Sequence, residues 1–265
     1  MGNILTIAGK EVRVYLTTWM SYILFGGFIL ITGLVFGSAV EQFQTQSMQY
    51  LQHNYRQGID MMNVTEGILA PLMYQMVFVL IFMLPVLTMR LFSEERRGKT
   101  LQLLMTAPVR PIEIVLGKYI GAVTVMTIMF ALSLLFPLLL HVFGISGADG
   151  LSPVDWNTVW TGYLGLFLFG CACVSIGLLA SSVTESQLVA VIISFGVLLV
   201  LWLVGLVSQG HTSGLQRVLY YASHITHLDG FLRGMVRLTD VVYYCSLSFA
   251  GIFLSWRVIE AERWK

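Results

Sequence analysis

SEERRGKTLQLLMTAPVRPIEIVLGK, residues 93–118, is the long polar and basic passage that separates two strongly apolar parts of the chain. It holds five of the fifteen Lys and Arg residues, and Arg90 stands just before it. The positive charge of the chain is therefore concentrated at this place. The five basic residues of the passage are Arg96, Arg97, Lys99, Arg110 and Lys118.

The middle of this passage predicts a short helix between two breakers. Gly98 interrupts the preceding segment, and Pro108 ends the one or two helical turns that we expect over Thr100–Met105. Pro111 then suits the first turn of a new helix, where its missing N–H costs nothing. A helix this short is marginal by itself in water, so it requires a partner. Its apolar side carries Leu101, Leu104 and Met105.

The composition indicates a polytopic membrane protein. Of 265 residues, 57% are hydrophobic and 11% charged, and the mean hydropathy is +0.80. Soluble domains carry about a quarter charged residues, so one soluble core cannot absorb this much apolar surface. The net charge of +1 gives no sign of a nucleic-acid partner, and we expect none. The three cysteines lie in apolar runs and are expected to be packing residues.

Residues 3–18 are amphipathic at helical spacing. Lys10 and Arg13 belong to a polar stripe, which is expected to face anionic lipid while the other face is buried. Glu11 falls on the apolar side, where it either reaches polar groups of the next segment or snorkels to water.

Long stretches without Asp, Glu, Lys or Arg predict six transmembrane helices, since about 20 residues cross the hydrocarbon layer. The last span is expected to be short, and residues 41–67 are expected to form one or two helices on the outer surface. The spans are expected at 19–40, between Glu66 and Arg90, between Lys118 and Asp149, and at about 157–183, 187–208 and 241–256.

The basic residues near the span ends predict the orientation. With the N-terminus inside, 11 basic residues lie on the cytoplasmic side and 4 outside. Both termini and residues 93–118 are therefore expected in the cytoplasm, and the chain is expected in the inner membrane. The four outer residues are Arg56, Arg217, Arg233 and Arg237.

Residues 209–240 predict two half-helices that dip into the outer leaflet or lie on it. Asp229 and Arg233 are four residues apart and can pair across one turn, and Thr239 or Asp240 can cap the sixth span. His224, His227 and Asp229 form the one cluster that resembles a metal site, but no third ligand is secured. We therefore expect surface or headgroup-level histidines and no metal.

The motifs that are missing exclude several classes of function. The apolar cores contain no Asp, Glu, Lys or Arg, which disfavours an ion-coupled carrier. The chain has no G-x-x-x-x-G-K-[ST], H-E-x-x-H or G-x-S-x-G motif, so we expect no enzyme activity on it. Small residues in the fourth span favour close helix packing over a dimer seam or a substrate lining. They are Gly170, Cys173, Gly177 and Ser181.

The passage Glu94–Leu104, EERRGKTLQLL, followed by APV at 107–109 and IVLGK at 114–118, resembles the segment after the second span in type-2 ABC exporter permeases. The resemblance extends over nearly the whole chain and is greatest to the gliding-motility-associated permease branch, with copper-enzyme-maturation permeases as a neighbour. It implies an all-α type V exporter fold and a single permease domain over 1–265. It also implies a second permease subunit, either identical or a close paralogue, and a separate ATPase that binds ATP and Mg.

In that resemblance, 3–18 is the elbow helix, 93–118 carries the coupling helix, and 209–240 forms re-entrant helices. An ordinary basic loop would explain the charge but not the short apolar face between two breakers. No cofactor is expected on this chain. The elbow residues implied are Lys10, Glu11 and Arg13, and the ATPase-coupling residues are Glu94, Glu95, Arg96, Arg97, Gly98, Thr100, Leu101, Leu104, Met105 and Pro108.

The expected role is that of a transducer between ATP hydrolysis on the partner and movement of a substrate through the bilayer. Two alternatives stay open at the level of sequence. One is a non-transporting transducer that passes motion to an extracytoplasmic accessory protein. The other is a membrane scaffold or enzyme that works without an ATPase, for which the chain offers no catalytic constellation.

Overall fold

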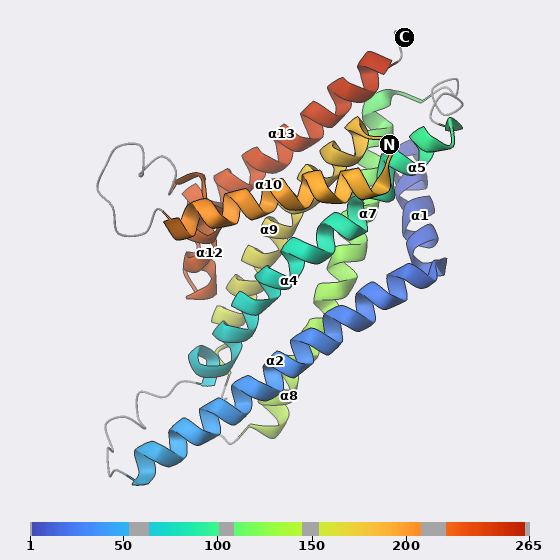
Figure 1. The fold of residues 1–265 in the computed structure, drawn as a ribbon. Coiled ribbons are helices and arrows are strands. Elements are labelled where there is room, and N and C mark those ends of the chain that lie inside the picture. The colour runs from blue at the N-terminus through green and yellow to red at the C-terminus, as the bar shows by residue number, and fades with distance from the viewer. Residues whose placement is uncertain (1, 53–63, 101–108, 145–153, 208–220, 263–265) are drawn as a thin grey trace.

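The structure is a computed structural model that describes residues 2–52, 64–100, 109–144, 154–207 and 221–262. Within these ranges the secondary structure is helical and no strand occurs, and six helices are long and apolar enough to cross a membrane. The predicted all-α fold with six spans is confirmed (Figure 1). The spans are Trp19–Gln49, Thr65–Arg97, Pro111–Phe143, Trp156–Val183, Gln187–Gly205 and Leu238–Glu262.

In the first part of the chain, the amphipathic N-terminal segment is a helix and turns at Thr18 into the first span. The surface helices expected over 41–67 are wrong for 41–52, because the first span continues through them as one helix. Glu and Gln are good helix formers, and no Gly or Pro interrupts them. The elements are α1 (Gly2–Thr17), α2 (Trp19–Gln52), the π-helical turn η1 (Thr65–Leu69), α4 (Ala70–Thr88) and α5 (Arg90–Arg97).

Among its described residues, the second part contains four longer helices and two short ones. The sixth span is not short as expected, since it has 25 residues. Its last turns stay helical because Glu, Ala and Arg are good helix formers, and Glu262 pairs with Arg96 of α5 at 2.6 Å. The elements are α7 (Pro111–Ser133), α8 (Leu135–Phe143), α9 (Trp156–Val183), α10 (Gln187–Val207), α12 (His224–Leu232) and α13 (Leu238–Glu262).

The bundle has two chemically different ends. At one end, which we call the charged end, α1 and α5 lie beside the start of α7 and the last turn of α13 (Figure 1). At the opposite end, the far end, lie η1, α8, the start of α9 and α12. The described parts of both chain termini are thus at the charged end.

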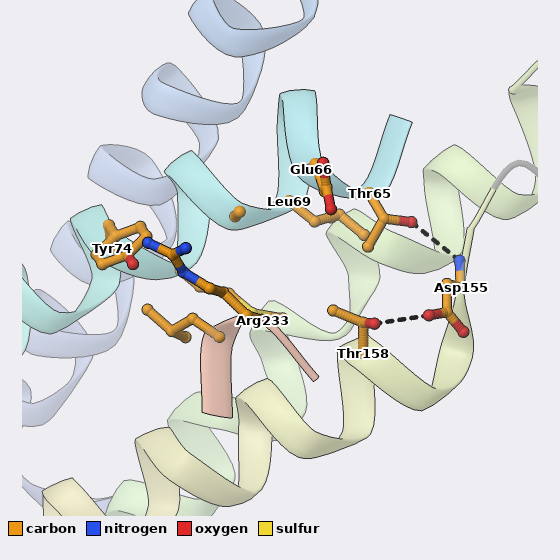
Figure 2. A pocket seen from close by; sticks show the side chains of 10 residues that line it. Thr65, Glu66, Leu69, Tyr74, Asp155, Thr158 and Arg233 are labelled. Atoms are coloured by element: carbon orange, nitrogen blue, oxygen red, sulfur yellow. Dashed lines mark hydrogen bonds between the residues drawn. The ribbon is translucent and has the colours of Figure 1, made fainter. Parts of the chain in front are cut away.

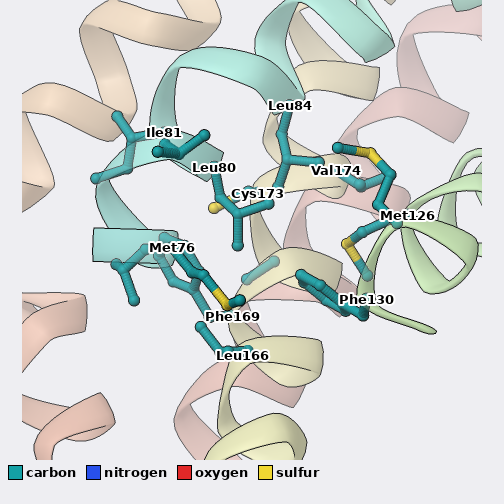
Figure 3. Close-up of a cluster of buried hydrophobic side chains, with 14 of the residues drawn as sticks. Met76, Leu80, Ile81, Leu84, Met126, Phe130, Leu166, Phe169, Cys173 and Val174 are labelled. Atoms are coloured by element: carbon teal, nitrogen blue, oxygen red, sulfur yellow. The ribbon is translucent and has the colours of Figure 1, made fainter. Parts of the chain in front are cut away.

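Helix α9 is the centre of the fold. It contacts α4, α5, α7, α10, α12 and α13, and it is the most deeply buried span, whereas α2 is the least buried. Phe169 and Cys173 of α9 lie among apolar side chains from α4 and α7, such as Leu80 and Met126 (Figure 3). A protein interior packed in this way tolerates little change in volume.

The small residues of α9 serve this packing within the chain. A Cβ added at Gly170 would overlap Met126, and one at Gly177 would overlap Thr88. Cys173 is 2% exposed and Ser181 is fully buried. The interpretation of close helix packing is therefore confirmed.

Candidate functional site

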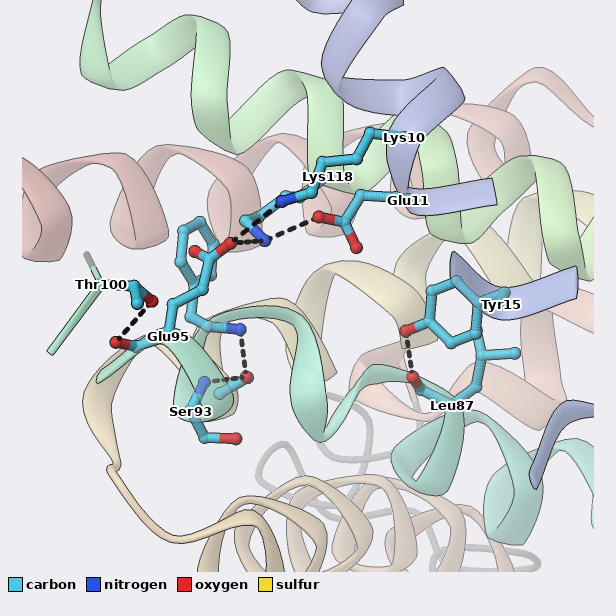
Figure 4. A network of polar contacts seen from close by, with 10 residues as sticks. Lys10, Glu11, Tyr15, Leu87, Ser93, Glu95, Thr100 and Lys118 are labelled. Carbon is cyan, nitrogen blue, oxygen red and sulfur yellow. Dashed lines mark hydrogen bonds and ion pairs between the residues drawn. The ribbon is translucent and has the colours of Figure 1, made fainter. Parts of the chain in front are cut away.

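A buried lysine joins three elements at the charged end. Lys118 of α7 places Nζ 2.9 Å from Oε1 of Glu11 on α1 and 2.8 Å from Oε1 of Glu95 on α5 (Figure 4). The Lys118 side chain is 3% exposed, and those of Glu11 and Glu95 are 10% and 17% exposed. Lys10 stands 4.0 Å from the same Glu95 oxygen. Burial makes such charges costly unless they are paired, so the ion pairs fix the three helices to one another.

Helix α1 reaches Lys118 because it lies very close to α7. Gly117 and Gly121 of α7 leave no room for a Cβ, since one would lie 2.8 Å from side-chain atoms of Ile7 and Glu11. Glu11 therefore has a polar partner, but that partner does not belong to the next segment as expected. Its carboxylate pairs with Lys118 of the third span and does not snorkel to water.

Tyr15, one turn after Glu11, attaches the same face of α1 to the second span. Its hydroxyl donates a hydrogen bond of 2.5 Å to the carbonyl of Leu87, near the end of α4. Burial raises the pKa of Tyr15, so the hydroxyl keeps its proton and remains a donor. The amphipathic N-terminal helix is thus attached both to α7 and to α4.

Helix α5 is held from two other sides. The Ser181 hydroxyl of α9 accepts hydrogen bonds from the backbone N–H groups of Phe92 and Ser93, at 2.9 and 3.1 Å (Figure 4). Arg96 pairs with Glu262 at 2.6 Å, which joins α5 to the last turn of α13. Because these partners come from α9 and α13, α5 cannot shift without disturbing the centre of the fold.

The chain leaves α5 through a sharp bend. The N–H of Gly98 bonds to the carbonyl of Glu94 at 2.9 Å, and Lys99 adopts a left-handed backbone with φ of 55°. The short helix predicted over Thr100–Met105 comes next in the sequence. It stays a prediction, because the structure does not describe Leu101, Leu104, Met105 and Pro108.

The chain is described again from Val109, and α7 begins at Pro111 as predicted. The Glu113 carboxylate accepts from the backbone N–H of Arg110 at 3.1 Å and from the side-chain amide of Asn3 at 3.3 Å. The start of α7 is therefore capped partly by α1.

A cavity of about 380 Å³ opens between α1, α5 and the start of α7. It brings together most of the predicted site residues that the structure describes. Arg13 and Arg97 are exposed and outside its lining, and Arg96 lies outside it too, paired with Glu262. Lys118 was missed as a site residue. A lysine two turns inside an apolar helix and a glutamate on the apolar side of another are a signal for this pair. The lining residues are Lys10, Glu11, Val14, Arg90, Glu94, Glu95, Gly98, Thr100 and Lys118.

A second cavity, of about 350 Å³, lies at the far end between η1, α4, α9 and α12 (Figure 2). Thr65 and Thr158 reach the Asp155 segment through hydrogen bonds of 2.9 and 2.6 Å. Arg233 pairs with Asp229 at 3.0 Å, as predicted. Both side chains of that pair are well exposed, so it contributes little to stability.

The two histidines of α12 are buried, which overturns their expected surface position. His224 is 1% and His227 is 3% exposed. The described residues hold no group of three metal-ligating side chains. The expectation that Thr239 or Asp240 caps α13 is also wrong, because both residues lie in the first turn of that helix, and the Asp240 carboxylate contacts His227 at 2.7 Å. A buried imidazole offers a stronger partner than an exposed helix terminus.

Comparison of the sequence with protein families gives one match. A family model described as "ABC-2 family transporter protein" matches residues 5–233, from α1 through α12. Among curated proteins, no sequence matches the chain.

Proposed function

The chain belongs to the ABC-2 family of transporter proteins, and from this premise we propose that it is the permease subunit of an ABC exporter. The family and the six spans make it a multi-pass membrane component of an ABC transporter that works with a separate ATPase. The finer proposal is that ATP and Mg bind on that ATPase, and that this chain converts their turnover into movement of a substrate outward. We assign it to the gliding-motility-associated branch.

The observation that carries the proposal is the anchoring of both ends of residues 101–108. On one side, α5 is held by Lys118, Ser181 and Glu262. On the other side, α7 begins in contact with α1 through Glu113 and Asn3. A force applied to 101–108 therefore reaches five helices at once, namely α1, α5, α7, α9 and α13. This is the property that a coupling segment needs, because a loose loop would absorb the motion.

In this proposal the chain pairs with a second permease subunit, identical or closely related, and both termini lie in the cytoplasm. The charged end then faces the ATPase, and α1 is the elbow helix. Leu101, Leu104 and Met105 would be buried in a groove of the ATPase, while the neighbouring cations meet acidic or backbone acceptors. An extracytoplasmic accessory protein would approach the far end.

The test is a double substitution, Leu101→Asp with Leu104→Asp, in the complex produced together with its ATPase. Two carboxylates in a buried apolar contact would each lose hydration without gaining a partner. We expect co-purification of the ATPase to fall at least tenfold, while the permease still inserts into the membrane and elutes as a folded species.

The matched control is Ser186→Asp, in the exposed turn between α9 and α10 at the same end of the bundle. It adds negative charge there without touching 101–108, so ATPase binding should stay at the wild-type level. Unchanged co-purification and unchanged transport in the Leu101/Leu104 variant would overturn the assignment of the coupling segment.

A further inference from the structure

The cavity of about 350 Å³ at the far end carries opposite charges on two sides. Glu66 of η1 and Asp155, which precedes α9, lie on one side, and the guanidinium of Arg233 lies on the other, beside Tyr74 (Figure 2). A single ligand in this cavity can therefore meet an anionic and a cationic group at once. The buried apolar side chains of the lining are Leu69, Met73 and Leu232.

Glu66 is the carboxylate of this cavity that is open to a ligand. It is exposed, and among the described residues it has no hydrogen bond or ion pair. Asp155, by contrast, accepts from the N–H of Asn157 at 3.1 Å and from the hydroxyl of Thr158 at 2.6 Å. Glu66 is also the last charged residue before the uncharged stretch that ends at Arg90. Its carboxylate therefore stands at the edge of the hydrocarbon layer, at the level of lipid headgroups.

The guanidinium of Arg233 is held in place and offers donors to an anion. Its Nε pairs with Asp229 at 3.0 Å, and Asp229 also accepts a hydrogen bond from the Tyr74 hydroxyl. A guanidinium has five N–H donors, and Nε supplies one of them. Those on the two terminal nitrogens match the oxygens of a phosphate.

The balance of charge favours a zwitterion over an anion. The lining holds two carboxylates and one guanidinium, and Asp229 adds a third carboxylate beside it. An anion alone would be repelled by this surplus, whereas a ligand with both charges matches both sides. A primary ammonium donates three hydrogen bonds and a quaternary one donates none. Glu66 therefore favours a primary ammonium.

An apolar groove adjoins the polar cavity. It has a volume of about 300 Å³, lies between α4, α10 and α12, and shares Tyr74 with the polar cavity. Phe78 of α4 and Trp202 of α10 line it, with ring centroids 5.9 Å apart. One turn deeper in the span, Phe82 of α4 packs on Phe195 of α10 at 4.8 Å. These aromatic faces can bury a hydrocarbon chain whose polar head lies in the neighbouring cavity.

We propose that the two cavities together bind a zwitterionic phospholipid with a primary ammonium in its headgroup, of the phosphoethanolamine type. Glu66 binds the ammonium, Arg233 binds the phosphate, and one acyl chain lies beside Phe78 and Trp202. In the orientation proposed above, this lipid comes from the outer leaflet. The site goes beyond the permease function, because it binds its lipid without an ATPase.

The test is native mass spectrometry of the full chain in detergent, titrated with three lipids that carry the same acyl chains. They are phosphatidylethanolamine, phosphatidylcholine and phosphatidylglycerol. We expect the first phosphatidylethanolamine to bind about tenfold more tightly than either of the others. Choline cannot donate a hydrogen bond to Glu66, and the anionic lipid has no ammonium to offset the carboxylates. Equal affinities for the three lipids would overturn the proposal.

Two substitutions separate the two charges of the headgroup. Glu66→Gln should abolish the preference for phosphatidylethanolamine over phosphatidylcholine, and its exposed, unpaired position keeps the fold intact. Arg233→Gln should weaken both lipids to the same degree, because both carry the phosphate. Glu41→Gln is the matched control, since it makes the same change in an exposed position of α2 outside the cavity and should keep the preference. A preference that survives Glu66→Gln would overturn the assignment.

Glycerophosphoethanolamine has the same headgroup without acyl chains, and it separates a lipid from a free zwitterion as the ligand. We expect it to displace phosphatidylethanolamine only at concentrations about a hundredfold higher, because it makes no apolar contacts in the groove. Trp202→Ala should weaken the lipid but not the chain-free compound. Displacement at equal concentrations would overturn the assignment to a lipid. These measurements use no ATPase, so their outcome is separate from that of the coupling assignment.

Discussion

At the scale of single residues, Lys118 is the side chain on which the charged end depends most. It lies between Glu11 and Glu95 with little access to water. Removal of one partner from a buried ionic group leaves the others without compensation, which costs more than the intact group contributes. The effect should therefore be much larger than that of an exposed pair.

We expect Lys118→Met to destabilise the purified protein by about 3–5 kcal/mol, since two buried carboxylates would then face each other. Denaturation in detergent, followed by loss of helical signal, measures this change. Restoring neutrality with Glu11→Gln and Glu95→Gln in the same chain should recover most of the loss.

Arg257→Met is the control for Lys118→Met, because Arg257 pairs with Glu260 in an exposed position on α13. Its effect should stay within about 1 kcal/mol. If both lysine and arginine variants gave equally small losses, the network at Lys118 would not be what holds α1 and α5 to α7.

The residue scale also shows what a sequence can reveal. Glu11 on an apolar face was visible as an anomaly, whereas Lys118 was placed before the third span and its burial was missed. Their pairing was not visible, because it depends on Gly117 and Gly121 letting α1 approach α7. A single sequence shows that such a charge needs a partner but not where the fold places one.

At the scale of helices, the packing can be tested most directly where α9 contacts α4. The hydroxyl of Thr88 occupies the place that a Cβ on Gly177 would take, and it is fixed by a hydrogen bond of 2.8 Å to the carbonyl of Leu84. The side chain of Thr88 is too short to move aside. The two helices must therefore separate if Gly177 is enlarged.

We expect Gly177→Ala to lower stability by about 1–3 kcal/mol through this overpacking. Thermal melting in detergent is the measurement. Gly196→Ala, on α10 with open space around it, makes the same chemical change without a clash and should be neutral or slightly stabilising. Equal melting temperatures for both variants would contradict the close contact.

Helix existence was predictable, but helix ends were less so. Stretches without charged residues located all six spans, because each charged side chain inside the hydrocarbon layer is costly wherever the fold places it. The ends of α2 and α13 were placed too early, because Gln, Glu and Arg continue a helix once it leaves the apolar layer. The burial of His227 was missed because its partner Asp240 belongs to another element.

At the scale of the whole molecule, the two ends of the bundle should lie on opposite sides of the membrane. The described parts of the loops after the second and fourth spans, and of both chain termini, lie at the charged end. Most of the basic residues lie there as well. Basic residues are retained on the cytoplasmic side during insertion. The charged end is therefore the one that we expect inside the cell.

Reporter fusions measure this orientation. A fluorescent protein that matures only in the cytoplasm, fused after Glu262 or after Glu185, should fluoresce. Alkaline phosphatase, active only outside, should be active when fused after Gly144 and inactive after Glu185. The reverse pattern would contradict the proposed orientation and would turn α5 away from any cytoplasmic ATPase.

The length of α2 has a consequence for the outline of the molecule in its bilayer. Its 34 residues measure about 51 Å at 1.5 Å each, whereas the hydrocarbon layer is about 30 Å thick. A tilt of about 20° shortens that length by only a few ångströms. Its last three turns, from Glu41 to Gln52, thus extend beyond the hydrocarbon layer at the far end. The surface on that side is therefore uneven. A large molecule that approaches it from outside the membrane contacts the end of α2 before it reaches α12.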